Sequence, residues 1–303
     1  MIRPTTFISS LRLNQAVGTQ VLIASETFQH SGNFKFRAAW YLVTHVPQKH
    51  LLTASSGNFG QALAMACQTV QKKCTVVMPS TAALVKVQAV REFGGYVEFS
   101  NGAPVSIADR IAQLTTRYPQ AYVADSAEDK LVIEGNSTLG VELAQKARDF
   151  DVVVVPIGGG GLAAGIITGL RSKHASIRVI GAEPLLANDA ARSFRAGRLI
   201  RDSCDCEATA KCFTIAEGAR GHLGVRTWEI IKDGLSDIIE VPEAEIRQAV
   251  RLLFHLANLK VEPTGALAVA AVLTTMHEFR NCRVCCVVTG GNVDPEVYCS
   301  MVE

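Results

Sequence analysis

A single lysine in an unusual setting offers the most direct chemistry in this sequence. Lys35 lies between Phe34 and Phe36, directly after a Gly-Asn pair and directly before the helix-favouring residues 38–40. A Gly-Asn pair interrupts regular structure, so we expect a helix whose first turn carries Lys35. Aromatic neighbours that exclude water lower the pKa of an amine, and a neutral amine attacks an aldehyde. An ordinary surface lysine at a helix start is the commoner alternative for this stretch alone.

A run of four glycines forms a second candidate site. It follows residues 152–157, a continuous β-branched run that predicts a strand buried on both faces. Glycines let backbone amides approach an anion, and the amino end of the following helix adds favourable partial charge. The spacing differs from the dinucleotide fingerprint, and no Gly-Lys-Ser/Thr follows as in a P-loop. We therefore predict a phosphate site rather than an unliganded tight turn at Gly158, Gly159, Gly160 and Gly161.

Polar residues follow two further predicted strands. Residues 55–58, Ser-Ser-Gly-Asn, stand between an apolar run and a predicted helix. Their hydroxyls and free amides suit a carboxylate, and the Asn58 amide can donate to a phenolate oxygen. Serine and asparagine also favour helix caps, and the two roles are compatible. Thr289 begins a Thr-Gly-Gly-Asn segment directly after the last apolar run.

Strand and helix patterns alternate along the chain. Strands are expected near residues 21–24, 51–54, 74–78, 96–99, 121–123, 152–157, 179–183, 238–241 and 283–289. Helices are expected near residues 61–70, 84–93, 107–116, 132–147, 162–170, 243–259 and 263–276. This alternation predicts parallel sheets with helices on both faces, in which ligands bind at the carboxyl ends of strands. All three candidate loops are expected at such ends.

The composition argues against several function classes. The chain has 303 residues, 48% of them hydrophobic, and a formal net charge of only +2 with scattered basic residues. We therefore expect no binding to nucleic acid or to an anionic membrane surface. The start lacks a signal-like apolar run, and no stretch reaches the roughly 18 apolar residues of a membrane span. The nine cysteines favour a reducing cytoplasm, and the spacing of Cys204, Cys206 and Cys212 matches no common zinc site.

The order of these motifs resembles the second fold type of pyridoxal-phosphate enzymes, and the resemblance covers nearly the whole chain. That family contains serine/threonine dehydratases, serine racemases, cysteine synthases and the tryptophan synthase β subunit. The resemblance implies an α/β fold of two lobes, each a mostly parallel sheet with helices on both faces. It places a large cofactor-binding domain at residues 1–49 and 130–303 and a small substrate-gripping domain at residues 50–129. It also implies a homodimer.

The resemblance assigns roles around the cofactor, pyridoxal 5′-phosphate. Lys35 looks like the Schiff-base lysine, the glycine run holds the phosphate, and Asn58 meets the ring hydroxyl. Thr289 stands where the family has a serine whose hydroxyl meets the pyridine nitrogen. A hydroxyl leaves that nitrogen largely unprotonated, which favours prompt loss of a β-leaving group. The implied cofactor contacts are Phe34, Lys35, Asn58, Gly158, Gly159, Gly160, Gly161 and Thr289.

The same resemblance assigns the substrate carboxylate to Ser55, Ser56, Gly57 and Asn58. Racemases of the family have a serine at the position of Ser56, where it acts as a second acid/base on the cofactor face opposite the lysine. Many dehydratases have alanine there. Ser56 therefore permits racemisation, although serine is also a common loop residue.

A quieter signal is Glu-Pro-x-x-Ala-x-Asp, which resembles the divalent-cation site of serine racemases and some dehydratases. The implied ligands are Glu183, the carbonyl of Ala187 and Asp189. Such oxygen ligands suit Mg²⁺, Mn²⁺ or Ca²⁺ without choosing among them, and a solvated turn is the alternative.

The chain departs from the family pattern at four places. Phe59 stands where dehydratases and racemases often have histidine. Residues 125–128 replace a His-Pro motif, and residues 135–138 replace Gly-Gln-Gly-Thr; both are expected as loops on the cofactor or substrate side. No counterpart of the amino-acid-sensing module of biosynthetic threonine dehydratases follows Glu303, so we expect a catabolic or unregulated enzyme.

The expected function is dehydration of a small β-hydroxy amino acid, L-serine or L-threonine, to a 2-oxo acid and ammonia. In this scheme Lys35 takes the Cα proton. A serine racemase with side dehydration is the close alternative, and a hydroxyaspartate dehydratase is another. A β-replacing cysteine synthase fits less well, because those enzymes usually carry threonine at the position of Phe59. A cofactor-binding protein without catalysis on the same scaffold is the non-enzyme alternative.

Overall fold

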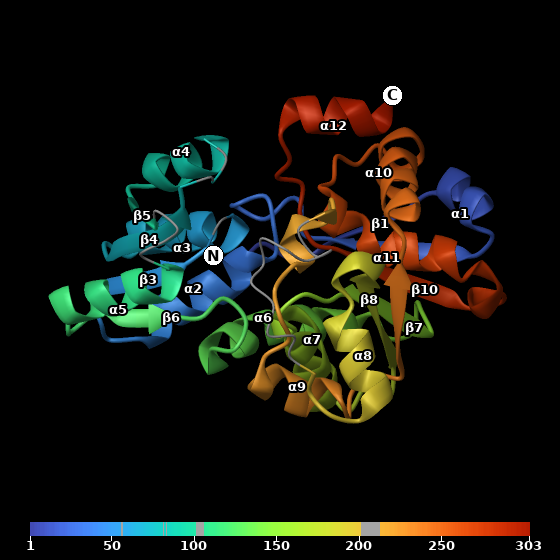
Figure 1. Ribbon diagram of the computed structural model, residues 1–303. Coiled ribbons are helices and arrows are strands. Elements are labelled where there is room, and N and C mark those ends of the chain that lie inside the picture. Colours follow the sequence, from blue (N-terminus) through green and yellow to red (C-terminus); the bar gives the residue numbers. More distant parts are fainter. Residues whose placement is uncertain (56, 81, 83, 101–105, 201–212) are drawn as a thin grey trace.

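Two open sheets with helices around them make up the fold in the computed structural model (Figure 1). The structure describes all residues except 56, 81, 83, 101–105 and 201–212. In chain order, the strands are β1 (Thr6–Ser9), β2 (Gln20–Ser25), β3 (His50–Ala54), β4 (Lys73–Pro79), β5 (Tyr96–Ser100), β6 (Tyr122–Ala124), β7 (Val152–Pro156), β8 (Arg178–Pro184), β9 (Asp237–Val241) and β10 (Arg283–Val288). The helices are α1 (Leu11–Val17), α2 (Lys35–His45), α3 (Asn58–Thr69), α4 (Leu84–Glu92), α5 (Ile107–Arg117), α6 (Lys130–Gln145), α7 (Gly161–Ser172), α8 (Asp189–Ala196), α9 (Val225–Ile231), α10 (Glu243–Ala257), α11 (Pro263–Thr274) and α12 (Pro295–Val302).

The strand order confirms the predicted α/β class. The larger sheet runs β1-β2-β10-β7-β8-β9 and the smaller sheet runs β5-β4-β3-β6. The described strand pairs are parallel except β1 with β2, which pair antiparallel at the edge of the larger sheet. All three candidate loops leave the carboxyl ends of strands, namely β3, β7 and β10, as predicted.

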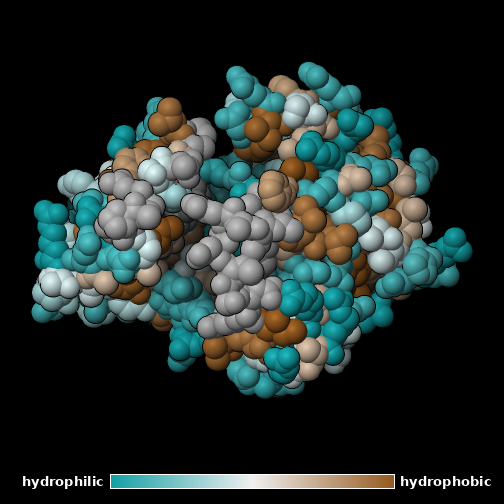
Figure 2. All heavy atoms as spheres, viewed as in Figure 1, coloured by the Kyte–Doolittle hydropathy of each residue, from teal (hydrophilic) through white to brown (hydrophobic). Residues whose placement is uncertain are grey.

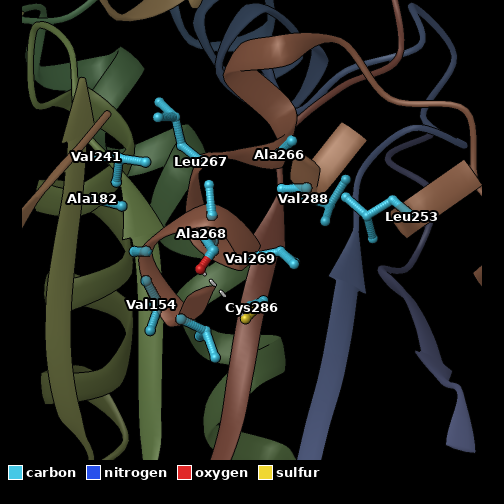
Figure 3. Packing of buried hydrophobic residues seen from close by; sticks show 14 of the residues in the cluster. Val154, Ala182, Val241, Leu253, Ala266, Leu267, Ala268, Val269, Cys286 and Val288 are labelled. Atoms are coloured by element: carbon cyan, nitrogen blue, oxygen red, sulfur yellow. Dashed lines mark hydrogen bonds between the residues drawn. The ribbon is translucent and has the colours of Figure 1, made fainter. Parts of the chain in front are cut away.

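Helices cover both faces of the larger sheet. On one face lies α11, which is buried nearly all round and packs on β7, β8 and β10 (Figure 3). Ala268 and Cys286 meet there, and Cys285 and Cys286 are fully buried thiols, as predicted. On the other face lie α6 and α7, which cross closely because Gly140 and Gly169 have no side chains. A Cβ on Gly140 would lie 2.4 Å from the Ile166 carbonyl oxygen.

The smaller sheet has its own core. Apolar residues of α2 and α3 pack on one face, whereas Leu114 of α5 packs with Leu52 and Val77 on the other. The four strands of this sheet lie within residues 50–129. The domain boundary stays a prediction, since α2 precedes residue 50 and still contributes Phe36 and Leu42 to this core.

The structure contradicts the expected loop at residues 135–138, which lie inside α6. The Asp129 side chain caps this helix by accepting a hydrogen bond from the Leu131 amide at 2.8 Å. Gly135 then lets α6 approach α2, because an added Cβ would lie 2.7 Å from Ala38 Cα. The small side chain at residue 135 therefore serves helix packing rather than a loop.

A buried ion cluster fixes the first turns of α2. The Arg37 guanidinium is fully buried and its Nε donates to the Glu26 carboxylate at 2.7 Å. Its other nitrogens donate to Glu142 at 2.8 Å and to the Thr5 hydroxyl at 2.8 Å. Buried charges are tolerated only when they are paired and hydrogen-bonded in this way. The cluster ties β2, α6 and the N-terminal segment to the helix that begins at Lys35.

The outer margin of the molecule is largely hydrophilic in the view of Figure 2. In the described part of the chain, no helix is both long and apolar enough to cross a bilayer.

Candidate active site

The start of α2 is held in place by several backbone contacts. Lys35 is the first residue of the helix, as predicted, and its amide donates to the Asn33 side chain at 3.0 Å. The Phe34 amide donates to the Thr289 carbonyl at 2.9 Å, which ties the start of α2 to the end of β10. Gly32 has a φ of 73°, a left-handed conformation that favours glycine. The Gly-Asn pair thus forms the turn that positions the lysine.

The Lys35 amine lies in a partly apolar pocket. Its Nζ donates to the Ser126 carbonyl at 2.8 Å and lies 5.1 Å from the centre of the Phe34 ring and 5.5 Å from that of Phe59. Desolvation lowers the pKa of this amine to about 8, and the negative charge of Asp125 partly opposes that shift. The amine is therefore close to the protonation state needed for attack on an aldehyde.

The predicted aromatic neighbours of the amine are only half right. Phe34 lies beside it, but Phe36 is fully buried in the core of the smaller lobe. Neighbouring residues of a helix point roughly 100° apart, so one of the two flanking rings had to face away from the amine. Phe59, at the start of α3, takes that place from a distant part of the chain.

The Ser55–Asn58 loop joins β3 to α3. The Ser55 hydroxyl oxygen accepts hydrogen bonds from the amides of Gly57 and Gly60, so its helix-capping role is present. The Asn58 amide nitrogen donates to a Glu262 carboxylate oxygen at 2.8 Å, and its oxygen accepts from Asn292 at 2.9 Å. Ser56 lies outside the described residues, as do Cys204, Cys206 and Cys212.

Glu262 is a site residue that the motif analysis missed. It directly precedes α11, and burial raises the pKa of its carboxyl to about 7 despite the hydrogen bond from Asn58. Its amide donates to the Gly290 carbonyl at 3.1 Å, next to the Thr289 segment. The available signal is a carboxylate placed directly before a wholly apolar helix, a position that forces burial.

The glycine run connects β7 to the amino end of α7, as predicted. Gly160 has a φ of 84°, which strains any other residue. A Cβ on Gly158 would lie 2.9 Å from the Gly218 carbonyl oxygen, and one on Gly159 would lie 2.7 Å from the Ala127 Cβ. The loop is therefore closely enclosed, with the amide-rich end of α7 available to an anion.

The structure brings the predicted cofactor residues together. Thr289, 2% exposed, contacts the start of α2 through its carbonyl oxygen. Asn292 links the loops after β3 and β10, since its amide donates to both Asn58 and the Ser31 carbonyl. Residues 125–128 touch both the Lys35 amine and the glycine run. Lysine, amide, hydroxyl and phosphate loop thus surround one region between the two sheets.

The predicted cation ligands lie where β8 meets α8. Glu183, Ala187 and Asp189 are all nearly or fully buried. The Glu183 carboxylate accepts from the amides of Ala190 and Ala191 at 3.1 and 2.9 Å, and Asp189 accepts from the Leu223 amide. Two buried carboxylates and a carbonyl suit a hard cation. The described residues contain no cluster of three or more His, Cys, Asp or Glu side chains, so a cation here would depend on the Ala187 carbonyl and water.

A lysine of lowered pKa beside a glycine phosphate loop, on this pair of sheets, defines the class of pyridoxal-phosphate enzymes of the second fold type. The chain belongs to the pyridoxal-phosphate-dependent enzyme family, whose profile matches residues 1–290. It is an enzyme of the lyase and racemase branch, and its cofactor is pyridoxal phosphate.

Sequence relatives come from both activities of that branch. A serine racemase of Arabidopsis thaliana is 35% identical over 304 residues, covering 97% of this chain and 89% of the relative. An L-threo-3-hydroxyaspartate ammonia-lyase of Pseudomonas sp is 33% identical over 304 residues, covering 99% and 93%.

Solved structures agree with the sequence relatives. A maize serine racemase superimposes with a TM-score of 0.90 at 30% identity, covering 99% of this chain and 92% of that one. A bacterial-type threonine deaminase, from the organism abbreviated T.th., superimposes with a TM-score of 0.88 at 34% identity, covering 97% and 94%. These similarities show the family and the fold, whereas the substrate of this chain is a separate question.

The lowered pKa of Lys35 predicts a specific pH dependence in the protein without cofactor. At pH 8 about half of the Lys35 side chains are neutral, compared with roughly 0.4% for an unperturbed lysine. Labelling by trinitrobenzenesulfonate, read by peptide mapping between pH 6.5 and 9.5, should therefore rise with a midpoint near 8 at Lys35. The exposed Lys73 supplies the reference peptide. A Lys35 labelling profile that still rises steeply at pH 9.5 would contradict the desolvated amine.

Proposed function

We propose that this enzyme removes water from a small β-hydroxy amino acid, L-serine or L-threonine, and releases a 2-oxo acid and ammonia. The observation that carries the proposal is the Lys35 amine, which has a pKa of about 8 and lies within the loops expected to hold cofactor and substrate. A base with a pKa near the working pH is well matched to removing a Cα proton.

The residues present fit the cofactor. The glycine run with its cradle at the amino end of α7 would hold the phosphate, and the Thr289 hydroxyl would meet the ring nitrogen. Phe34 and Asn58 would flank the ring, with Asn58 already oriented by Glu262 and Asn292. When bound, pyridoxal phosphate withdraws electrons from the substrate Cα and makes its proton acidic.

The chain's own groups would divide the remaining work. Lys35 would hold the cofactor before substrate arrives, and its freed amine would then take the Cα proton. Ser55, Ser56, Gly57 and Asn58 would orient the substrate carboxylate through hydroxyls and amides. Phe34 and Phe59 would keep water from the amine, which strengthens each electrostatic contact at the site.

Serine racemisation is the second candidate, and two observations favour it. Sequence relatives include serine racemases, such as that of Homo sapiens at 34% identity. The sequence also carries Ser56, the residue type that racemases of the family use as a second acid/base. In this role Ser56 would return a proton to Cα from the face opposite Lys35.

Product analysis separates the two candidates. The holoenzyme with L-serine and Mg²⁺ should form pyruvate, followed in the same tube as chiral amino-acid analysis. If D-serine accumulates as well, Ser56→Ala should remove the D-serine and spare the pyruvate. Pyruvate without D-serine would make the enzyme a dehydratase in which Ser56 only binds the carboxylate. Neither product from L-serine or L-threonine would contradict the proposed elimination.

Three further features belong to the proposal. We propose that Glu183, the Ala187 carbonyl and Asp189 hold Mg²⁺, Mn²⁺ or Ca²⁺ in support of the fold. We also propose a homodimer, by analogy with the family alone. A cytoplasmic location is proposed as well, and the six free cysteines among the described residues fit a reducing compartment.

A further inference from the structure

The segment between β6 and α6, residues 125–128, forms a wall of the site. The Ser126 carbonyl accepts the hydrogen bond from the Lys35 amine at 2.8 Å. Ala127 packs against the glycine run, where a Cβ on Gly161 would lie 2.8 Å from the Ala127 carbonyl oxygen. This wall therefore lies directly between the amine and the phosphate loop, where the sequence departs from its family's His-Pro motif.

Asp125 is the first residue of the wall. Strand β6 pairs in parallel with β3, with Ala124 opposite Thr53, so Asp125 leaves the sheet beside the Ser55–Asn58 loop. The Asp125 Oδ1 accepts from the amides of Ala127 at 2.8 Å and Glu128 at 2.7 Å. This turn fixes the side chain, which is exposed, at the edge of the substrate region.

The charge of Asp125 reaches the reacting groups. It is the charge that opposes the desolvation of the Lys35 amine. The nearest cation of the carboxylate loop is already compensated, since Lys86 lies against Gly57 and pairs with Glu217 at 2.5 Å. An anionic substrate side chain would therefore meet a fixed like charge, and like charges repel at this range.

We infer that Asp125 is a specificity-determining residue that selects substrates with a neutral β-substituent and disfavours a second carboxylate. This inference rests on the proposed elimination and narrows its substrate class to L-serine and L-threonine rather than hydroxyaspartate. All candidate substrates share the α-carboxylate, so the discrimination falls on the β-carboxylate alone.

The test uses a substitution that keeps the turn. Asp125→Asn retains the oxygen that accepts from Ala127 and Glu128 but removes the charge. The ratio of kcat/KM for L-threo-3-hydroxyaspartate to that for L-serine should rise about tenfold at low salt, and the gain should shrink as salt is added. Asp237→Asn is the matched control, because Asp237 begins β9 at the opposite, amino edge of its sheet.

A binding measurement gives a second readout that needs no turnover. Calorimetric titration of the holoenzyme with succinate and with propionate compares a dicarboxylate with a monocarboxylate. Asp125→Asn should tighten succinate relative to propionate about tenfold at low salt, and Asp237→Asn should leave the ratio unchanged. An unchanged ratio in Asp125→Asn, or a wild-type preference for hydroxyaspartate over L-serine, would overturn the inference. If no β-hydroxy amino acid is eliminated, the proposed function fails, while the succinate ratio still decides the role of Asp125.

Discussion

Replacing Lys35 by alanine is expected to lower the rate of elimination by about 10³-fold or more. The amine is the base of the proposed reaction, and loss of a positioned general base typically costs 10²–10⁴-fold. The variant also loses the covalent hold on the cofactor, which adds to the effect. Pyruvate formation from L-serine at saturating pyridoxal phosphate measures the loss.

Amine rescue distinguishes a chemical role of Lys35 from a structural one. Ethylamine added to Lys35→Ala should restore part of the activity, because the truncated side chain leaves space next to Phe34 and Phe59. Lys73→Ala removes an exposed lysine and serves as the control, with activity close to wild type. Elimination by Lys35→Ala within tenfold of the wild-type rate would assign the base to another residue.

Replacing Arg37 by methionine is expected to reduce the free energy of unfolding by about 3–5 kcal/mol, because breaking a buried ion pair leaves an uncompensated charge. Arg37 and Glu26 are both fully buried, so the remaining Glu26 carboxylate would have no water to replace its partner. Urea denaturation followed by circular dichroism measures the change. The exposed pair between Arg283 and Asp151 provides a control, since Arg283→Met should leave the midpoint close to wild type.

The destabilisation by Arg37→Met should depend on pH. Burial raises the pKa of Glu26 above 4.5 even with Arg37 present, and removing the guanidinium raises it further. Between 4.5 and that raised pKa, the folded variant binds more protons than the unfolded chain, so its stability falls as the pH rises. The loss should therefore be larger at pH 8 than at pH 5.5. A loss equal at the two pH values would contradict a charged Glu26 as its cause.

The parts of the site that the sequence predicts are those with local signals. The Gly-Asn turn before Lys35 and the glycine run after β7 depend on residues adjacent in the chain, and both have the predicted structure. The strands follow from continuous apolar runs, with loops at their carboxyl ends. The antiparallel β1 and helices α1, α8, α9 and α12 were not predicted, because they are short or lack a sustained apolar period.

Contacts between distant segments account for the rest. Phe59 replaces Phe36 beside the amine because α3 packs across the site, which the stretch around Lys35 cannot indicate. The hydrogen bond from Asn58 to Glu262 joins residues 204 positions apart. Residues 135–138 form part of α6 because Gly135 packs on α2, a tertiary contact that overrides the weak helix propensity of glycine and asparagine.

Borohydride reduction of the holoenzyme tests the central claim, that Lys35 carries the cofactor, most directly. Reduction makes the link between lysine and cofactor permanent, and proteolysis with mass spectrometry then locates it. We predict that the reduced cofactor is found on the peptide containing Lys35 and on no other lysine peptide. A cofactor mass on a different lysine, or no tagged peptide at all, would contradict the assignment of this site and the mechanism built on it.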